Sequence, residues 1–367
     1  MVRVSAALIV RDEAAFIGDC LRSLAGNVDE IVFVDTGSRD DTIEIARRFP
    51  IKLYRYLWSN DFSAARNFAL EKATAEWILY IDADERLEIS NRDALASLLV
   101  DHRKVAWKLR LHPRIGWTAY SELRLFRNDP RIRFRGVIHE RIQPDVESVA
   151  RSDGLIVGAC EVRLQHVGYE ADQRPKNARN IPLLRDYLSR DPNRLYCWWH
   201  LGECLRLSGD EDSAIEALSK GIARLRVVRP EYQNLGDSVL YLSLLKLMHG
   251  RGAVINDLLA EALAIFPGQL ALQCMAAQLA VERGDCDTAR MVLERLTSID
   301  AETFFDPELA YDKALFRHLS AEPLALCYFR DGRYQDAARL YRLAARTAPD
   351  PTACEVKARL AELRALA

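Results

Sequence analysis

Short runs of consecutive apolar residues alternate with helix-like periodicity in the first half of the chain. Residues 6–10 are a continuous apolar run, and residues 30–34 form a second apolar run after Glu30, the pattern typical of strands that are buried on both faces. Between them, residues 13–24 place apolar side chains at helical spacing, which predicts a strand–helix–strand unit. The alternation continues with a helix over 42–48, a strand over 51–57, a helix over 63–75 and a strand over 77–81. The pattern predicts an α/β domain with a mostly parallel sheet, whose ligands bind at the carboxyl ends of the strands.

From about residue 175 the strand pattern gives way to helical periodicity with small residues at recurring positions. The spacing resembles the helical hairpins of tetratricopeptide repeats, most clearly in the last copy, at Tyr328, Gly332, Ala337, Tyr341, Ala344 and Pro349. Small residues let the two helices of a hairpin cross closely, and each hairpin buries its apolar face against the next one. A plain helical bundle is the alternative. We therefore expect two domains, an α/β domain over residues 1–172 and an all-α repeat domain over residues 173–367.

Composition narrows the class of protein. The 367 residues are enough for two buried cores. With 51 Lys and Arg against 53 Asp and Glu, the net charge is -2, so no overall positive excess points to nucleic-acid binding.

No apolar run approaches the roughly 18 residues of a membrane span, and none forms a secretory signal, so we expect no transmembrane segment and a cytoplasmic protein. The eight cysteines are scattered without a CxxC pair, which predicts reduced and mostly buried thiols rather than a zinc site.

The strongest chemical signal is the apolar run 77–81 followed directly by Asp82, Asp84 and Glu85. Carboxylates this close repel one another unless a cation relieves them. Oxygen ligands at a strand edge suit Mg²⁺ or Mn²⁺, which in turn hold the phosphates of a substrate. The alternative is an acidic turn that caps the next element.

Another acid, Asp35, directly follows the predicted strand 30–34, where it could accept hydrogen bonds from a ribose or a base. Dinucleotide-binding folds place glycines after the first strand, whereas residues 10–14 contain none, which disfavours a hydride-transfer enzyme. Arg66 falls near the positive end of a predicted helix and could recognise a base carbonyl or a phosphate. It could equally be a surface arginine paired with Asp61 or Glu71.

Residues 103–141 contain eleven Lys and Arg against three acids, a local positive excess that suits an anionic donor or acceptor.

Together and in this order, several segments resemble family 2 glycosyltransferases of the GT-A fold over residues 3–170. These are residues 10–13, 34–38, 58–67 and 82–85. The resemblance implies a nucleotide-sugar donor, with uridine diphosphate as the expected nucleotide, and Mn²⁺ or Mg²⁺ as cofactor. It places Asp82 beside the ribose, Asp84 on the metal, Asp35 with Arg66 near the base, and Ala83, Arg11 and Glu13 in the nucleotide-sugar site.

Residues 134–140 resemble the acceptor-side segment of bacterial members that include lipopolysaccharide core transferases. Displacement with inversion needs one positioned base, for which Glu140 is the candidate and His139 the alternative. Glu140 could instead pair with Arg135 or Arg141. His166 lies in a His-x-Gly-Tyr element of the same family and could join Asp84 on the metal or only form a local hydrogen bond.

A GT-A domain joined to helical repeats also resembles transferases that glycosylate cysteines or serines of ribosomal peptides. The sequence therefore predicts a metal-dependent, inverting hexosyltransferase that acts on a peptide, protein or cell-envelope glycan. The repeats could also form a homodimer or dock another enzyme. Two other functions remain open: a repeat scaffold whose α/β domain only binds nucleotide, and a nucleotidyltransferase. The latter needs a Gly-rich phosphate loop with a lysine, which residues 10–16 do not provide.

Overall fold

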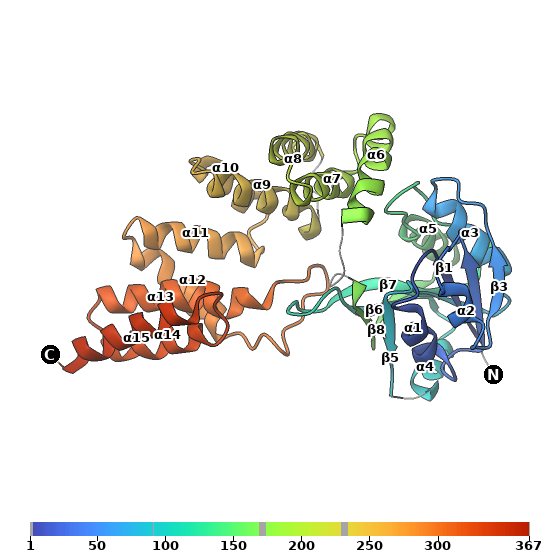
Figure 1. The fold of residues 1–367 in the computed structure, drawn as a ribbon, viewed down its shortest axis with the longest axis horizontal. Helices are drawn as coiled ribbons and strands as arrows, with labels where there is room; N and C mark the ends of the chain where they lie inside the picture. The colour runs from blue at the N-terminus through green and yellow to red at the C-terminus, as the bar shows by residue number, and fades with distance from the viewer. Residues whose placement is uncertain (1–2, 91, 169–173, 229–233, 367) are drawn as a thin grey trace. The chain divides into compact units, whose positions relative to one another are not determined.

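The computed structural model describes residues 3–90, 92–168, 174–228 and 234–366 (Figure 1). The described residues form two compact units. The first runs to Ile115 and continues over Tyr120–Pro192, and the second joins Gly116–Ala119 to the chain from Asn193 onward. The expected boundary between residues 172 and 173 lies outside the described residues, and helix α6 (Arg174–Arg190) groups with the first unit.

The first unit contains an eight-stranded sheet in the order β3-β2-β1-β4-β7-β6-β8-β5. Its strands are β1 (Val4–Val10), β2 (Glu30–Asp35), β3 (Lys52–Arg55), β4 (Trp77–Tyr80), β5 (Glu85–Glu88), β6 (Lys104–His112), β7 (Tyr120–Arg127) and β8 (Ile156–His166). Strands β3, β2, β1 and β4 run parallel, as the strand–helix–strand pattern predicts. The other half is mixed, because β7 pairs antiparallel with β4 and with β6, and β5 pairs antiparallel with β8. The predicted α/β class is confirmed. The sheet is parallel at β2, β1 and β4, which include the strands that lead to Asp35 and Asp82.

Helices cover both faces of this sheet (Figure 1). One face packs on α1 (Ile17–Leu24), α2 (Thr42–Ala46) and α4 (Arg92–Leu99). The other packs on α3 (Phe62–Lys72) and α5 (Gln143–Asp153). Successive strand residues point to opposite faces, so the apolar β1 supplies Leu8 to the first layer and Ala7 to the second. Because both faces of these strands are buried, their sequences are nearly continuous runs of apolar residues.

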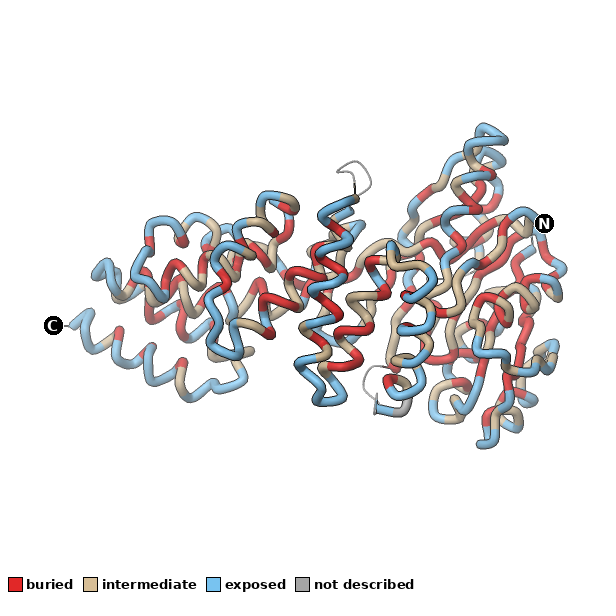
Figure 2. The backbone as a smooth tube through the Cα atoms, turned by 90° about the horizontal axis from the view of Figure 1, so that it is seen from above, coloured by how far each residue is buried: buried red, intermediate tan, exposed pale blue. Residues whose placement is uncertain are grey.

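The second unit is built from consecutive helices that pack as hairpins. The helices are α7 (Leu195–Leu207), α8 (Glu211–Leu225), α9 (Val239–Gly250), α10 (Asn256–Ile265), α11 (Leu270–Glu282), α12 (Cys286–Ser298), α13 (His318–Arg330), α14 (Tyr334–Ala345) and α15 (Pro351–Leu366), with short 3₁₀ turns over Leu235–Ser238 and Lys313–Phe316. A Cβ on Gly202 of α7 would lie 2.6 Å from Cγ of Leu218 on α8. Only glycine permits this close crossing, which is the reason for the small residue in the repeat pattern. Figure 2 shows buried residues recurring along one side of these helices.

A four-residue segment between β6 and β7 joins the helical unit, which the sequence pattern did not indicate. The backbone of Thr118 donates to the carbonyl of Tyr311 (2.8 Å), and the Thr118 hydroxyl accepts from the Tyr311 amide (2.9 Å). Thr118 is buried, so these hydrogen bonds satisfy its polar groups away from water.

All eight cysteines are free thiols, and all but Cys160 are buried. A search of the described residues finds no helix with the length and apolar character needed to cross a membrane.

Candidate functional site

The sequence-predicted residues gather at one edge of the sheet. Val10 at the end of β1 pairs with Asp35 at the end of β2, and β4 runs parallel to β1 on its other side. Because parallel strands end at the same edge, the segments that follow them come together there. These segments carry Arg11 and Glu13 after β1, and Asp82 and Asp84 after β4.

Arg66 is the buried centre of the first cluster. It lies on α3, whose start is fixed by the Asp61 carboxylate accepting from the amide of Ala64 (3.0 Å). Arg66 is 8% exposed; its Nη2 donates to Oδ1 of Asp82 (2.7 Å) and its Nε donates to Oε1 of Glu140. The surface interpretation of Arg66, paired with Asp61 or Glu71, is therefore wrong.

Two aromatic rings enclose this guanidinium, those of Tyr80 at 5.2 Å and Phe134 at 5.5 Å. The rings exclude water from the ion pairs, which strengthens them. Burial opposes ionisation of Asp82, but Arg66 and then Arg124 outweigh it and lower the pKa of Asp82 to about 2. Asp82 is therefore a carboxylate at neutral pH.

Glu85 has a different role from the one its sequence position suggests. It is fully buried and accepts two hydrogen bonds from Arg124, at 3.0 and 2.7 Å. Its Oε2 also accepts from the amide of Asp82 (2.9 Å). Burial raises the pKa of Glu85 to about 8, against the attraction of Arg124. Glu85 and Arg124 therefore hold the turn that carries Asp82, and Glu85 is not a third open carboxylate.

Asp84 lies in a separate contact group with His166 and Lys176. Its Oδ2 is 3.4 Å from Nε2 of His166 and 3.2 Å from Nζ of Lys176. A Cβ on Gly168 would lie 2.0 Å from the same oxygen, so glycine is required beside the acid. Tyr169, the last residue of the His-x-Gly-Tyr element, lies outside the described residues.

Asp84 and His166 could hold a divalent cation. Burial lowers the pKa of His166, against the opposing effect of Asp84, so its imidazole is neutral and can offer a lone pair. One carboxylate oxygen and one imidazole nitrogen 3.4 Å apart fit neighbouring positions around Mn²⁺ or Mg²⁺. No cluster of three or more His, Cys, Asp or Glu suited to a metal occurs in the described part of the chain. The donor set therefore fits a metal that takes its remaining ligands from substrate and water.

Glu13 faces the same group of charges. Its Oε1 lies 3.9 Å from Nζ of Lys176, and its amide donates to the hydroxyl of Thr42 (2.8 Å). Burial raises the pKa of Glu13 to about 7; Lys176 lowers it, while Asp84 and Asp82 raise it. Glu13 is therefore partly protonated at neutral pH.

This shift predicts a pH-dependent stabilisation by Glu13→Gln. The folded-state pKa of about 7 exceeds the ordinary value of 4.5, so the folded protein binds the proton more tightly and wild-type stability falls as pH rises through that window. Gln mimics the protonated side chain and removes the loss. The variant should match wild type near pH 4.5 and be more stable by roughly 2–3 kcal/mol above pH 7. Denaturant unfolding in chelator from pH 4.5 to 8 measures this, and a pH-independent difference would contradict it.

The other predicted residues occupy distinct positions. Asp35 is 4% exposed, and its two oxygens accept from the amides of Gly37 (3.2 Å) and Ser38 (3.0 Å). Its described contacts thus hold its own turn, with β1 between it and the strand that leads to Asp82. The Ala83 side chain is buried in the hydrophobic core, and its carbonyl accepts a hydrogen bond from Arg86 (3.1 Å). Arg11 lies at the exposed rim, 3.6 Å from the carboxylate of Asp12.

His139 and Glu140 lie on a short loop closed by the paired backbones of Arg135 and Arg141. His139 has a φ of 51°, a left-handed conformation that is strained for a residue with a side chain. The loop directs Glu140 to Arg66, and Arg135 pairs with Asp145 instead (2.7 Å).

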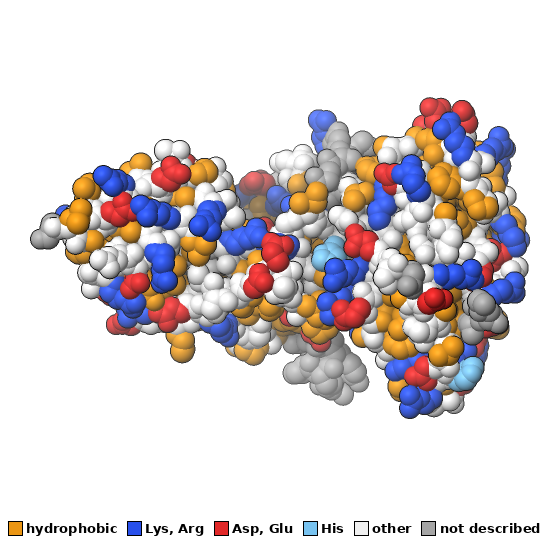
Figure 3. Space-filling model, turned by 90° about the horizontal axis from the view of Figure 1, so that it is seen from below, with side chains coloured by type: hydrophobic (Ala, Val, Ile, Leu, Met, Phe, Trp, Pro, Cys, Tyr) orange, Lys and Arg blue, Asp and Glu red, His pale blue; other side chains and the backbone are white. Residues whose placement is uncertain are grey.

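The positive segment 103–141 is not a row of unpaired cations. Several of its arginines are in ion pairs, namely Arg103 with Asp101, Arg110 with Glu161, Arg124 with Glu85, Arg131 with Asp129 and Asp153, and Arg135 with Asp145. On the face shown in Figure 3, basic and acidic side chains are interspersed. The local excess seen in the sequence is thus partly offset by acids, several of them from outside the segment.

Comparison with known proteins finds a family model and several curated proteins to which this chain is similar. Residues 5–147 match the model of Glycosyl transferase family 2. A TPR repeat-containing protein of Synechococcus elongatus is 37% identical over 257 residues, 68% of this chain and 63% of that protein. The SPbeta prophage-derived glycosyltransferase SunS of Bacillus subtilis is 29% identical over 251 residues, 66% of this chain and 58% of its own length.

A lipopolysaccharide core biosynthesis glycosyltransferase, LpsC of Rhizobium meliloti, is 32% identical over 157 residues, 39% of this chain and 57% of that protein. The chain thus spans about three fifths of the length of these relatives. The resemblance to family 2 transferases is confirmed over residues 5–147, and the name of the Synechococcus elongatus relative agrees with the resemblance to tetratricopeptide repeats.

Proposed function

From the premise that residues 5–147 form a glycosyl transferase family 2 domain, we propose that this chain transfers a sugar from a nucleotide sugar to an acceptor nucleophile. The proposal rests on the two hydrogen bonds of buried Arg66. One goes to Asp82, at the sheet edge where we place the donor, and the other goes to Glu140, on the loop where we place the acceptor. Three segments far apart in the sequence thus meet at Asp82, two positions before Asp84.

On the donor side, Asp82 is an ionised hydrogen-bond acceptor suited to ribose hydroxyls, and Asp35 lies two strands along the same edge. Asp84 and His166 would hold Mn²⁺ or Mg²⁺. When bound, such a cation offsets the negative charge that builds up on the departing nucleoside diphosphate. Arg11 and Glu13 line the rim of this donor site, and uridine diphosphate is the nucleotide we propose.

On the acceptor side, Glu140 is the proposed base. Arg66 holds one of its oxygens, which fixes the carboxylate in one orientation. Removal of the acceptor proton by Glu140 lets the nucleophile attack the anomeric carbon while the nucleoside diphosphate leaves from the opposite face, which inverts the configuration. His139, on the same loop, is the alternative base.

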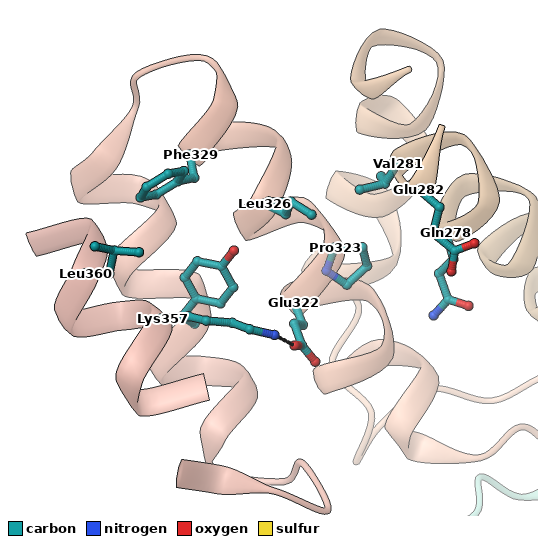
Figure 4. Close-up of a pocket in the computed structure, with 10 residues that line it drawn as sticks. Gln278, Val281, Glu282, Glu322, Pro323, Leu326, Phe329, Lys357 and Leu360 are labelled. Atoms are coloured by element: carbon teal, nitrogen blue, oxygen red, sulfur yellow. Dashed lines mark hydrogen bonds and ion pairs between the residues drawn. The ribbon is translucent and has the colours of Figure 1, made fainter. Parts of the chain in front are cut away.

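The helical unit offers a surface for the acceptor. A pocket of about 550 Å³ opens among α11, α13, α14 and α15, with apolar residues such as Leu326 and Phe329 in its wall (Figure 4). Lys357 reaches Glu322 across it (2.6 Å), which leaves a paired charge at the apolar surface. Repeat surfaces of this kind bind extended peptides, so the pocket supports a peptide or protein acceptor over a cell-envelope glycan.

A homodimer through the repeat domain stays a prediction. Helix α15 exposes Val356, Leu360 and Leu363 on the face opposite its buried Cys354 and Ala358. Static light scattering of the intact chain measures its oligomeric state.

Hydrogen exchange locates the donor independently of activity. Uridine diphosphate with Mn²⁺ should protect residues 8–15, 33–38 and 80–88 from exchange and leave α7 to α15 unchanged, because Asp35, Asp82 and Asp84 all lie on the first unit. Mn²⁺ alone is the control. Protection confined to residues beyond 193 would place the nucleotide on the helical unit and contradict the proposal.

A further inference from the structure

Lys176 reaches the metal-binding acid from outside the matched family domain. It lies in the first turn of α6, 29 positions beyond the end of the matched residues 5–147. Its Nζ is 3.2 Å from Oδ2 of Asp84 and 3.9 Å from Oε1 of Glu13. Lys176 is the ammonium closest to Asp84 in the described part of the chain.

Charge balance explains why the lysine lies there. The Asp84 side chain is 9% exposed, and a buried carboxylate needs a partner of opposite charge. His166 lies on one side of Asp84, with its Nε2 3.4 Å from Oδ2, and the Lys176 ammonium lies 3.2 Å from the same oxygen. Lys176 therefore supplies the positive charge when only protein groups are present.

A divalent cation on Asp84 changes this balance. The ammonium and the cation would then repel each other at one carboxylate, so Lys176 has to find a different anion within reach. Its side chain is 36% exposed and has a flexible four-carbon stem, which leaves the ammonium free to turn. The anion that arrives together with the cation is the diphosphate of the donor.

We propose that Lys176 is a donor-binding residue: its ammonium pairs with Asp84 in the free protein and binds the diphosphate of the nucleotide sugar once a divalent cation takes Asp84. The inference rests on the proposed function for the identity of the donor. It extends the donor site from the matched domain onto α6, the last helix of the first unit.

Nucleotide titrations test the role of Lys176 without catalysis. The affinities of uridine diphosphate and uridine monophosphate are measured in saturating Mn²⁺ by calorimetry, for wild type, Lys176→Met and Lys176→Arg. Arg185→Met, which removes an exposed cation from the same helix, is the matched control. Lys176→Met should weaken diphosphate binding by roughly 10-fold or more, the scale of one charge-assisted contact, and weaken monophosphate binding less. Lys176→Arg should retain most of the affinity.

The outcomes separate this inference from the proposed function. Equal weakening of both nucleotides would show that Lys176 only holds α6 against the sheet, and unchanged affinities would show no role; either result overturns the inference. If wild type itself binds neither uridine nor guanosine diphosphate, the proposed function fails and the inference falls with it. Thermal unfolding of each variant shows whether the fold is kept.

Discussion

Asp84→Asn is expected to abolish sugar transfer while both units stay folded. The amide keeps the size of the carboxylate but lacks the charge that a divalent cation and Lys176 both require. Loss of several kcal/mol of transition-state stabilisation corresponds to roughly 10³-fold or more in rate. Transfer rates with Mn²⁺, measured beside thermal unfolding, check this.

Asp93→Asn is the matched control, because Asp93 is an exposed acid on α4, on the same unit. It should behave as wild type. Wild-type turnover in Asp84→Asn, or full wild-type activity in excess chelator, would remove the metal from the proposed mechanism.

Glu140→Gln is expected to bind donor normally and to lose transfer by roughly 10²-fold or more, the scale for loss of a general base. The amide oxygen can still accept the hydrogen bond from Nε of Arg66, so the loop should keep its position. What disappears is the proton acceptor for the attacking group. Transfer rates over a pH series, beside direct titration of donor binding, measure both effects.

The matched control is Glu161→Gln, which removes a Glu–Arg ion pair with Arg110 on the exposed surface. If the acceptor is a thiol, which is already partly ionised near neutral pH, the loss in Glu140→Gln should be smaller and should shrink as pH rises. An unchanged rate at every pH would show that Glu140 only pairs with Arg66. Loss in His139→Ala alone would move the role to His139.

Much of the fold could be predicted because buried parallel strands leave a clear pattern. The strands around Leu8 and Phe33 are buried on both faces and read as unbroken apolar runs. The start of a helix was harder to predict. The helix predicted over 13–24 begins at Ile17, because the Glu13 amide donates to Thr42 of another segment and Glu13 stays outside the helix. Apolar periodicity contains no information about such a contact.

The individual roles of the acids could not be predicted from their order. Three neighbouring acids suggested one cation site, yet each has a different partner: Asp82 has Arg66, Glu85 has Arg124, and Asp84 has His166 and Lys176. These partners are 16 to 92 positions away along the chain. Only the folded sheet brings them together, and Lys176 gave no signal because it comes from a helix beyond the recognisable segments.

The most direct test of the central claim is the release of free nucleoside diphosphate from a panel of nucleotide sugars, with and without Mn²⁺. Wild type should release nucleoside diphosphate from at least one donor by hydrolysis or transfer, this release should need the metal, and Asp84→Asn should show none. If wild type binds a nucleotide but releases nucleoside diphosphate from no donor with any divalent cation, the α/β unit is a nucleotide-binding scaffold and the enzymatic account is wrong.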